Sequence, residues 1–105
     1  MDQRAILGDI VQRILSVHPH AHIILFGSRA SDAARADSDF DLLIVAPDLR
    51  LGEPPSARIR RALRGLGRSF DLVVVTPDEW ASMRRVRGSV VRVASETGRV
   101  LHEAA

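Results

Sequence analysis

The sequence predicts an α/β fold in which helices pack on a small sheet of three to four strands. Apolar runs of strand length recur at residues 22–26, 39–46 and 70–75, and segments with helical periodicity alternate with them. Apolar residues make up 46% of the chain and charged residues 27%, which is the usage of a folded protein rather than a disordered one. Such alternation is typical of a domain built from layers of helix and sheet.

The length of 105 residues suffices for one hydrophobic core and is too short for a catalytic domain with a separate substrate domain. We therefore expect a single domain over residues 1–105. Cysteine is absent, which excludes disulfides and thiolate zinc sites. Charged residues interrupt the N-terminal segment, and no apolar run approaches membrane-spanning length. We expect a cytoplasmic protein that does not contact a membrane.

All 15 basic residues are arginine, yet 13 acidic residues leave a formal net charge of only +2. Arginine without lysine or asparagine is more typical of a GC-rich coding bias than of nucleic-acid binding, and four aromatic residues are few for base stacking. Direct nucleic-acid binding is therefore not expected. We interpret two arginine clusters as solvated helix faces: Arg58, Arg60, Arg61 and Arg64, and Arg84, Arg85 and Arg87.

The first half of the chain predicts a helix, a strand and a turn. Apolar residues recur at helical spacing over residues 5–17, and the segment 18–20 then ends the helix. Residues 22–26 are β-branched and aromatic, which predicts a buried strand that leads into a tight turn at Gly27-Ser28. Ser28 is a candidate N-cap for a short helix that reaches about Arg35.

The second strand, over residues 39–46, begins with two acids. Asp39 and Asp41 precede an apolar run that Pro47 ends. Since side chains in a strand alternate with a period of two, both acids should lie on one face. An amphipathic helix follows Pro55, with its apolar residues inward and its arginines mostly outward.

The last part of the chain predicts a strand, a well-defined helix start and a final short strand. Residues 70–75 are apolar apart from Asp71. Thr76 is a candidate N-cap, Pro77 stands at the first helical position, and Glu79 completes a capping box. A strand is expected at residues 99–102. Between this helix start and the final strand, an apolar stripe at helical spacing contains Trp80, Met83, Val86, Val90 and Val93.

The three acids at the strand starts are candidate metal ligands. Carboxylates at the mouth of a hydrophobic strand repel one another unless a cation or a proton compensates them. Asp71 opens its strand at a place equivalent to Asp41, so adjacent strands would bring both acids and Asp39 to one edge. Mg²⁺ prefers such hard oxygen ligands together with substrate phosphates, and two ions can stabilise the attacking and leaving oxygens.

The turn at Gly27-Ser28 is a candidate phosphate site. Gly27 lets the backbone approach a ligand without a Cβ, the amides that follow can hold phosphate oxygens, and Ser28 adds a hydroxyl donor. A Gly-Ser pair alone usually marks a turn, and an Asp-x-Asp is expected about once in a chain with this many aspartates. Gly-Ser followed after ten residues by Asp-x-Asp is expected in roughly 0.004 chance occurrences. The joint pattern, rather than either motif alone, therefore indicates a functional site.

Residues 25–30, with the sequence LFGSRA, and residues 38–45, with SDFDLLIV, closely resemble the nucleotidyltransferase superfamily that includes DNA polymerase beta and kanamycin nucleotidyltransferase. The spacing matches the Gly-Ser-x10-Asp-x-Asp pattern of that superfamily, and the leading helix and the Asp71 strand occur in its order. The resemblance implies the nucleotidyltransferase fold, α/β (α+β), with a small mixed sheet of three to four strands and helices packed on it.

The short chain resembles the minimal nucleotidyltransferases, stand-alone catalytic domains often encoded beside a helical HEPN protein as a toxin-antitoxin pair. This resemblance implies a Mg²⁺-dependent enzyme that transfers AMP from ATP to a tyrosine hydroxyl of the HEPN ribonuclease and so acts as its antitoxin. The sequence departs from the family pattern at Asp32, where glycine is common, and this departure concerns the loop's shape more than the chemistry.

The resemblance also implies roles for individual residues. Asp39 and Asp41 would bind the metal ions that bridge the triphosphate, and Asp71 would complete the site and help to deprotonate the attacking hydroxyl. Nucleotide binding would fall to the segment Gly27, Ser28 and Arg29, in which the first two hold the phosphates and the arginine adds charge near them.

The chain contains no tyrosine, so a tyrosine acceptor must lie on a partner molecule. Two alternatives remain open. A non-catalytic antitoxin or binding module of the same fold would neutralise its partner by contact. A subunit of an antibiotic or small-metabolite nucleotidyltransferase would need an acceptor pocket, which so short a chain could complete only by oligomerising.

Overall fold

The computed structural model describes residues 2–31, 35 and 37–104, which form a four-stranded sheet with helices on both faces. The strand order is β3-β2-β1-β4. β1 runs antiparallel to both β2 and β4, whereas β3 runs parallel to β2, so the sheet is mixed as expected. The strands are β1 (His22–Phe26), β2 (Phe40–Val45), β3 (Phe70–Val75) and β4 (Arg99–His102).

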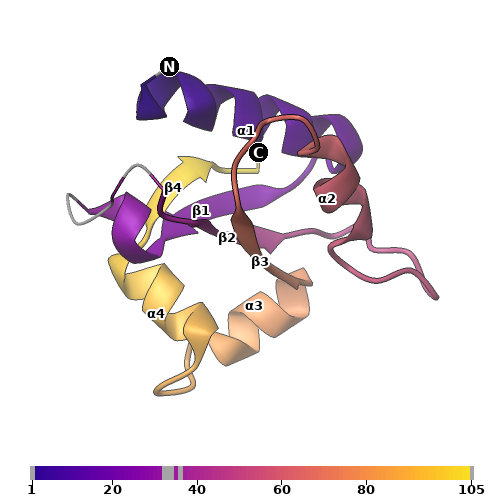
Figure 1. Ribbon diagram of the computed structural model, residues 1–105. Coiled ribbons are helices and arrows are strands. Elements are labelled where there is room, and N and C mark those ends of the chain that lie inside the picture. The colour runs from indigo at the N-terminus through magenta and orange to yellow at the C-terminus, as the bar shows by residue number, and fades with distance from the viewer. Residues whose placement is uncertain (1, 32–34, 36, 105) are drawn as a thin grey trace.

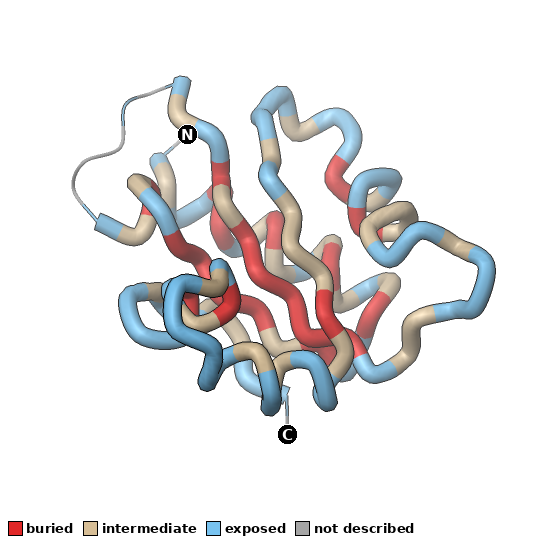
Figure 2. Tube along the Cα trace, turned by 90° about the horizontal axis from the view of Figure 1, so that it is seen from below, coloured by how far each residue is buried: buried red, intermediate tan, exposed pale blue. Residues whose placement is uncertain are grey.

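In the described part of the chain, four α-helices cover the sheet in two pairs (Figure 1). α1 (Gln3–Val17) and α2 (Ala57–Ala62) pack on one face, and α3 (Pro77–Met83) and α4 (Val90–Thr97) pack on the other. One hydrophobic cluster lies between the sheet and α1 and α2, and a second lies between the sheet and α3 and α4. Because side chains alternate along each strand, β1, β2 and β3 contribute residues to both clusters. Figure 2 shows that burial is concentrated along these central strands.

The helix boundaries follow from capping. α1 begins because the side chain of Asp2 accepts a hydrogen bond from the amide of Ala5, and it ends just before His18-Pro19. At the start of α3 the hydroxyl of Thr76 accepts a hydrogen bond from the amide of Glu79 at 3.1 Å, and the carboxylate of Glu79 accepts one from the amide of Thr76 at 2.9 Å. This confirms the predicted capping box. Within the described part of the chain, no helix has both the length and the apolar character needed to cross a membrane.

The predicted helix after Ser28 is wrong over its described part. Residues 27–30 form a 3-10 helix, η1 (Gly27–Ala30), and Ser28 lies inside it rather than before it. Ser31 already returns to extended backbone, with φ −128° and ψ 179°. The rest of the predicted helix, at residues 32–34 and 36, and the departure from the family pattern at Asp32 lie outside the described residues.

The predicted apolar stripe along the last helices, interrupted at Gly88, is confirmed at Trp80 and Met83, which pack against the core, and is wrong at Val86, Val90 and Val93, which are exposed. Gly88 takes a φ of +84°, which separates α3 from α4. Val90 and Val93 are 42% and 47% exposed, whereas Val91 and Ala94 are buried against the sheet. The run from Val90 to Ala94 offers apolar residues on both helix faces, so the sequence pattern could not decide which face packs.

Candidate functional site

The parallel pairing of β2 with β3 places two acids side by side. Asp41 is the register partner of Asp71, and Phe40 is the partner of Phe70. The two rings lie with centroids 5.8 Å apart and belong to the cluster under α1 and α2. Because side chains alternate, Asp41 and Asp71 extend to the other face, on the side of α3 and α4. The Phe-Asp pair that opens both strands therefore sets the register of the acids.

The acids interact electrostatically. Burial raises the pKa of the Asp41 carboxyl, and the negative charges of Asp71 and Asp39 raise that pKa further. Asp39 and Asp71 are exposed, and Asp41 is half-buried. None of these three carboxylates forms an ion pair with a residue that the structure describes. The group thus has a concentration of negative charge that the described chain leaves uncompensated, as at many functional sites.

Gly27 lies in direct contact with this group. Phe26 pairs with Asp41 across β1 and β2, so the turn that follows β1 reaches the start of β2. A Cβ at residue 27 would stand 2.1 Å from Oδ2 of Asp41, and the backbone there has a φ of +71°. Both facts require glycine. The predicted glycine turn and the predicted acids therefore meet at one corner of the sheet.

Arg29 of η1 is buried, and its contacts lie within the fold. Its Nε and Nη2 donate to the carbonyl of Ser38 at 3.1 and 2.8 Å, and its Nη1 donates to the side-chain oxygen of Gln3 at 3.2 Å. The guanidinium carbon lies 4.2 Å from the ring centroid of Phe40. Arg29 thereby ties η1 to the segment that enters β2, and its role in nucleotide binding stays a prediction. The sequence pattern gave no sign of this burial.

The donor chemistry of the site fits Mg²⁺. In this conformation, no three acidic or histidine side chains of the described residues are arranged to hold a metal ion. The carboxylates of Asp39, Asp41 and Asp71 are nevertheless hard oxygen donors, and the missing Cβ of Gly27 lets Oδ2 of Asp41 lie directly against the turn.

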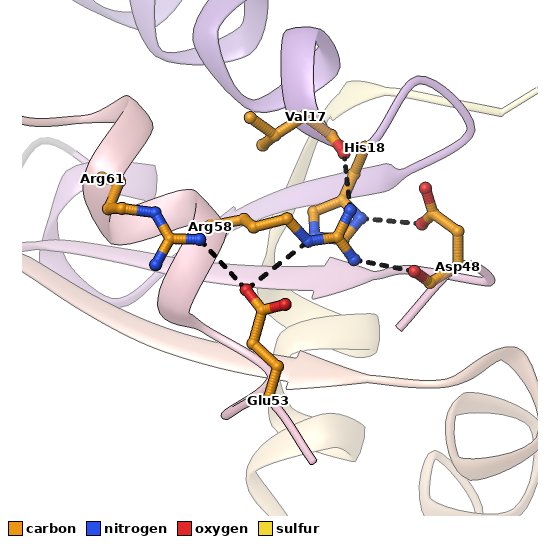
Figure 3. A network of polar contacts seen from close by, with 6 residues as sticks. All are labelled: Val17, His18, Asp48, Glu53, Arg58 and Arg61. Carbon is orange, nitrogen blue, oxygen red and sulfur yellow. Dashed lines mark hydrogen bonds and ion pairs between the residues drawn. The ribbon is translucent and has the colours of Figure 1, made fainter. Parts of the chain in front are cut away.

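The opposite end of the sheet has a charged network of another kind, which the sequence analysis missed (Figure 3). Nδ1 of the fully buried His18 lies 2.7 Å from a carboxylate oxygen of Asp48. Arg58 donates to the carbonyls of Asp48 and Val17 at 2.8 and 3.3 Å. Burial acts to raise the pKa of Asp48, but the hydrogen bond and charge of His18 and the charge of Arg58 together lower it.

Glu53 extends this network. Its carboxylate lies 3.1 Å from Nη2 of Arg61 and 3.8 Å from Nε of Arg58. The interpretation as a solvated helix face is therefore wrong for Arg58, whose side chain is only 14% exposed, whereas Arg61 pairs with the same acid and is still 56% exposed. These contacts hold the loop after β2 on α1 and α2. Because the charged groups of the network pair with one another, we do not assign them to a ligand site.

The fold and the acids beside a glycine turn fit the class of proteins that bind nucleotides through divalent cations. The model of the nucleotidyltransferase domain family matches residues 6–98. The chain therefore belongs to the nucleotidyltransferase domain family.

Solved structures show the same fold. A toxin-antitoxin crystal structure with AMP-PNP is similar with a TM-score of 0.66 at 21% identity, over 93% of this chain and 73% of that one. A candidate nucleotidyltransferase from Sulfolobus solfataricus is similar with a TM-score of 0.57 at 23% identity, over 90% of this chain and 75% of that one. No curated protein matches the chain significantly.

Proposed function

We propose that this chain is a Mg²⁺-dependent nucleotidyltransferase that transfers AMP from ATP to a tyrosine hydroxyl of a HEPN ribonuclease toxin and acts as its antitoxin. The observation that carries the proposal is the contact between the glycine turn and the acids, in which a Cβ on Gly27 would stand 2.1 Å from Asp41. Family membership supports nucleotidyl transfer. The similarity to a toxin-antitoxin structure with AMP-PNP supports both the nucleotide and the kind of partner.

In this proposal the three acids hold the metal ions, two in number, and Gly27 and Ser28 bind the triphosphate. When bound, the ions neutralise phosphate charge and stabilise the oxygens of the displacement. The raised pKa of Asp41 fits such a role, because the ionised carboxylate is destabilised in the absence of a cation. The backbone at Gly27 can approach a phosphate closely because no side chain intervenes.

The proposed reaction is a displacement at the α-phosphorus of ATP. The tyrosine oxygen forms a new bond to that phosphorus, the bond to the bridging oxygen of the β-phosphate breaks, and pyrophosphate leaves with that electron pair. The hydroxyl proton passes to the carboxylate of Asp71 and then to solvent. Asp71 is exposed on β3, the edge strand beside β2, so a hydroxyl from outside can reach it.

The acceptor must come from a partner chain, since this chain has no tyrosine. We therefore propose a hetero-oligomer of antitoxin and toxin in the cytoplasm, with residues 1–105 as a single catalytic domain. The partner would supply the acceptor hydroxyl and the surface around it, which a chain of 105 residues does not provide by itself.

One experiment tests the proposal directly. The chain is incubated with ATP, Mg²⁺ and the product of its neighbouring gene, and that product is then weighed by intact mass spectrometry. We expect a gain of one or more AMP units, which is absent when Mg²⁺ is chelated or when Asp39→Asn and Asp41→Asn are introduced together. No gain with any of the four ribonucleotides would contradict it. Neutralisation that persists in the double variant would instead support inhibition by contact.

A further inference from the structure

A hollow of about 390 Å³ lies at the β3 edge of the sheet, and none of the three acids lines it. It shares residues 67–69 with a neighbouring hollow of about 330 Å³ that Asp37 and Ser38 also line. Its floor includes Phe70 and Leu72, which belong to the cluster under α1 and α2, whereas Asp71 between them extends to the opposite face. Three arginines surround this floor: Arg60, Arg64 and Arg68. The arginine hollow, as we name it, is therefore separate from the candidate catalytic site.

The cations of the arginine hollow lack acidic partners. Arg61 pairs with Glu53, and Arg92 with Glu96. By contrast, no ion pair joins Arg60, Arg64 or Arg68 to any residue that the structure describes. All three are exposed. Their mutual repulsion is unrelieved within the described chain, so an anion would be attracted to this place.

Neighbouring groups add to the positive potential. The guanidinium of Arg13 donates to the carbonyls of Ala62 and Arg64 at 3.1 and 2.8 Å, which brings a fourth positive charge to the end of α2. Residues 67–69 line the hollow, and none of their three successive amides has an acceptor among the described residues. These amides are free to donate to a ligand, as in the anion-binding loops of many proteins.

The loop leaves room for a ligand at its glycines. Gly65 and Gly67 have φ values of +88° and +67°, and a Cβ on either would meet no atom within 4 Å. The open space beside both glycines contrasts with Gly27, where a Cβ would strike Asp41. The glycines thus allow the left-handed backbone conformation of the loop, and no described atom fills the space beside them.

We propose that the arginine hollow binds the phosphate of a nucleotide, with the base on the floor of Phe70 and Leu72. Guanidinium groups and backbone amides are the donors that phosphate oxygens prefer. The volume is in the range of small-molecule sites, and a flat base complements an apolar floor with an aromatic ring. This site uses no residue of the catalytic proposal and does not rest on it.

The test is a titration of the ¹⁵N-labelled full chain with AMP in EDTA, followed by amide chemical shifts. EDTA removes the divalent cations on which the catalytic site would depend. We expect saturable shifts of the amides of Gly65, Gly67 and Ser69. Affinity should fall about tenfold or more with Arg64→Gln and Arg68→Gln together, because two charge-assisted contacts are lost. The matched control, with Arg84→Gln and Arg85→Gln, removes the same charge from the segment just after α3 and should leave the affinity unchanged.

Three outcomes would overturn the inference. No saturable shift at these amides at millimolar AMP would exclude the site. An equal loss of affinity in the control variant would show that only net charge attracts the ligand. Inorganic phosphate that binds as tightly as AMP would show that the apolar floor contributes nothing and would remove the nucleotide assignment. If the double variant failed to fold, its amide signals would lose their chemical-shift dispersion. The single variant Arg68→Gln would then replace it in the titration.

Discussion

The two ends of the sheet contain charged side chains in opposite situations. Where β1 ends and β2 and β3 begin, Asp39, Asp41 and Asp71 gather without an ion pair to any described residue, and their charges raise the pKa of Asp41. Where β1 begins and β2 ends, His18 and Asp48 lie 2.7 Å apart within the network of Figure 3. We call these the acid end and the paired end.

The difference separates function from stability. Charges of opposite sign that meet inside one chain compensate each other and hold elements together, as at the paired end. Charges of one sign that remain uncompensated lower the stability of the fold, so their presence is explained by a ligand that compensates them. Variants of the acid end should therefore change activity, and variants of the paired end should change stability.

The largest effect is expected at the acid end. Asp39→Asn should lower the initial rate of AMP transfer about 10²- to 10⁴-fold, because it removes a carboxylate that we assign to the metal ions. Asp37→Asn, two residues earlier in the segment before β2, is the matched control and should keep the rate. Equal rates for wild type and Asp39→Asn, measured with radiolabelled ATP, would remove the acid end from the mechanism.

The next effect is expected at the paired end. His18→Ala should reduce the free energy of unfolding by about 2–4 kcal/mol, because it empties a fully buried position and leaves Asp48 without its hydrogen bond. Urea denaturation measures this loss, and the transfer rate per folded molecule should not change. A loss of rate at unchanged stability would contradict the separation of the two ends.

The paired end also predicts a pH dependence. Since the pKa of Asp48 is lowered in the folded state, its ionised form contributes stability above the ordinary value of 3.8. That contribution is lost as the pH falls through the lowered pKa. The acid-side fall in unfolding free energy should therefore be shallower in His18→Ala than in wild type. Parallel curves for both proteins would show that His18 does not shift the pKa of Asp48.

A smaller effect isolates the contact between Gly27 and Asp41. Gly27→Ala and Gly52→Ala both place a Cβ on a backbone of positive φ, at +71° and +83°, and each should lose about 1 kcal/mol of stability from that strain. Only Gly27→Ala also brings the Cβ against Asp41, so it alone should lose further stability and most of its transfer rate. Identical behaviour of the two variants would mean that the turn can move away from the acid.

The smallest effect is a gain. Because the pKa of Asp41 is raised, its protonated form is favoured in the fold, and stability falls as the pH rises through that pKa. Asp41→Asn mimics the protonated form, so it should stabilise the inactive protein by a few tenths to about 1 kcal/mol at pH 7. The gain should disappear well below pH 3.8, the ordinary value, where both proteins are neutral at this position. A loss of stability at pH 7 would show that the carboxylate is already compensated.

Local patterns were sufficient for the positions of the strands, although Asp39, the first residue of the predicted second strand, lies before β2 and its place on a common face with Asp41 stays a prediction. The Phe-Asp pairs at residues 40–41 and 70–71 start both strands, and the sheet register then aligns Asp41 with Asp71. The capping box at Thr76 depends only on residues three apart, and it is confirmed. The strand starts and the capping box could be predicted because each is decided within a few residues, whereas the alignment of Asp41 with Asp71 depends on the parallel pairing of β2 with β3.

The features that the sequence did not reveal depend on distant partners. Arg29 is buried because Gln3 and Ser38 lie around it in space, and His18 finds its acid 30 residues later. The packed face of α4 depends on which of its valines meets the sheet, and Val91 rather than Val90 does so. Periodicity cannot distinguish two apolar faces, nor can composition show which arginines have partners.

We propose that three carboxylates beside Gly27 share a divalent cation with a nucleoside triphosphate. Mn²⁺, which accepts the same oxygen ligands as Mg²⁺, broadens the NMR signals of nearby amides, so its place can be read from the ¹⁵N-labelled chain with AMP-PNP. We predict that Mn²⁺ with AMP-PNP broadens the amides of Gly27, Asp41 and Asp71 and spares Asp48. Broadening centred on Asp48, or none at all, would contradict the account.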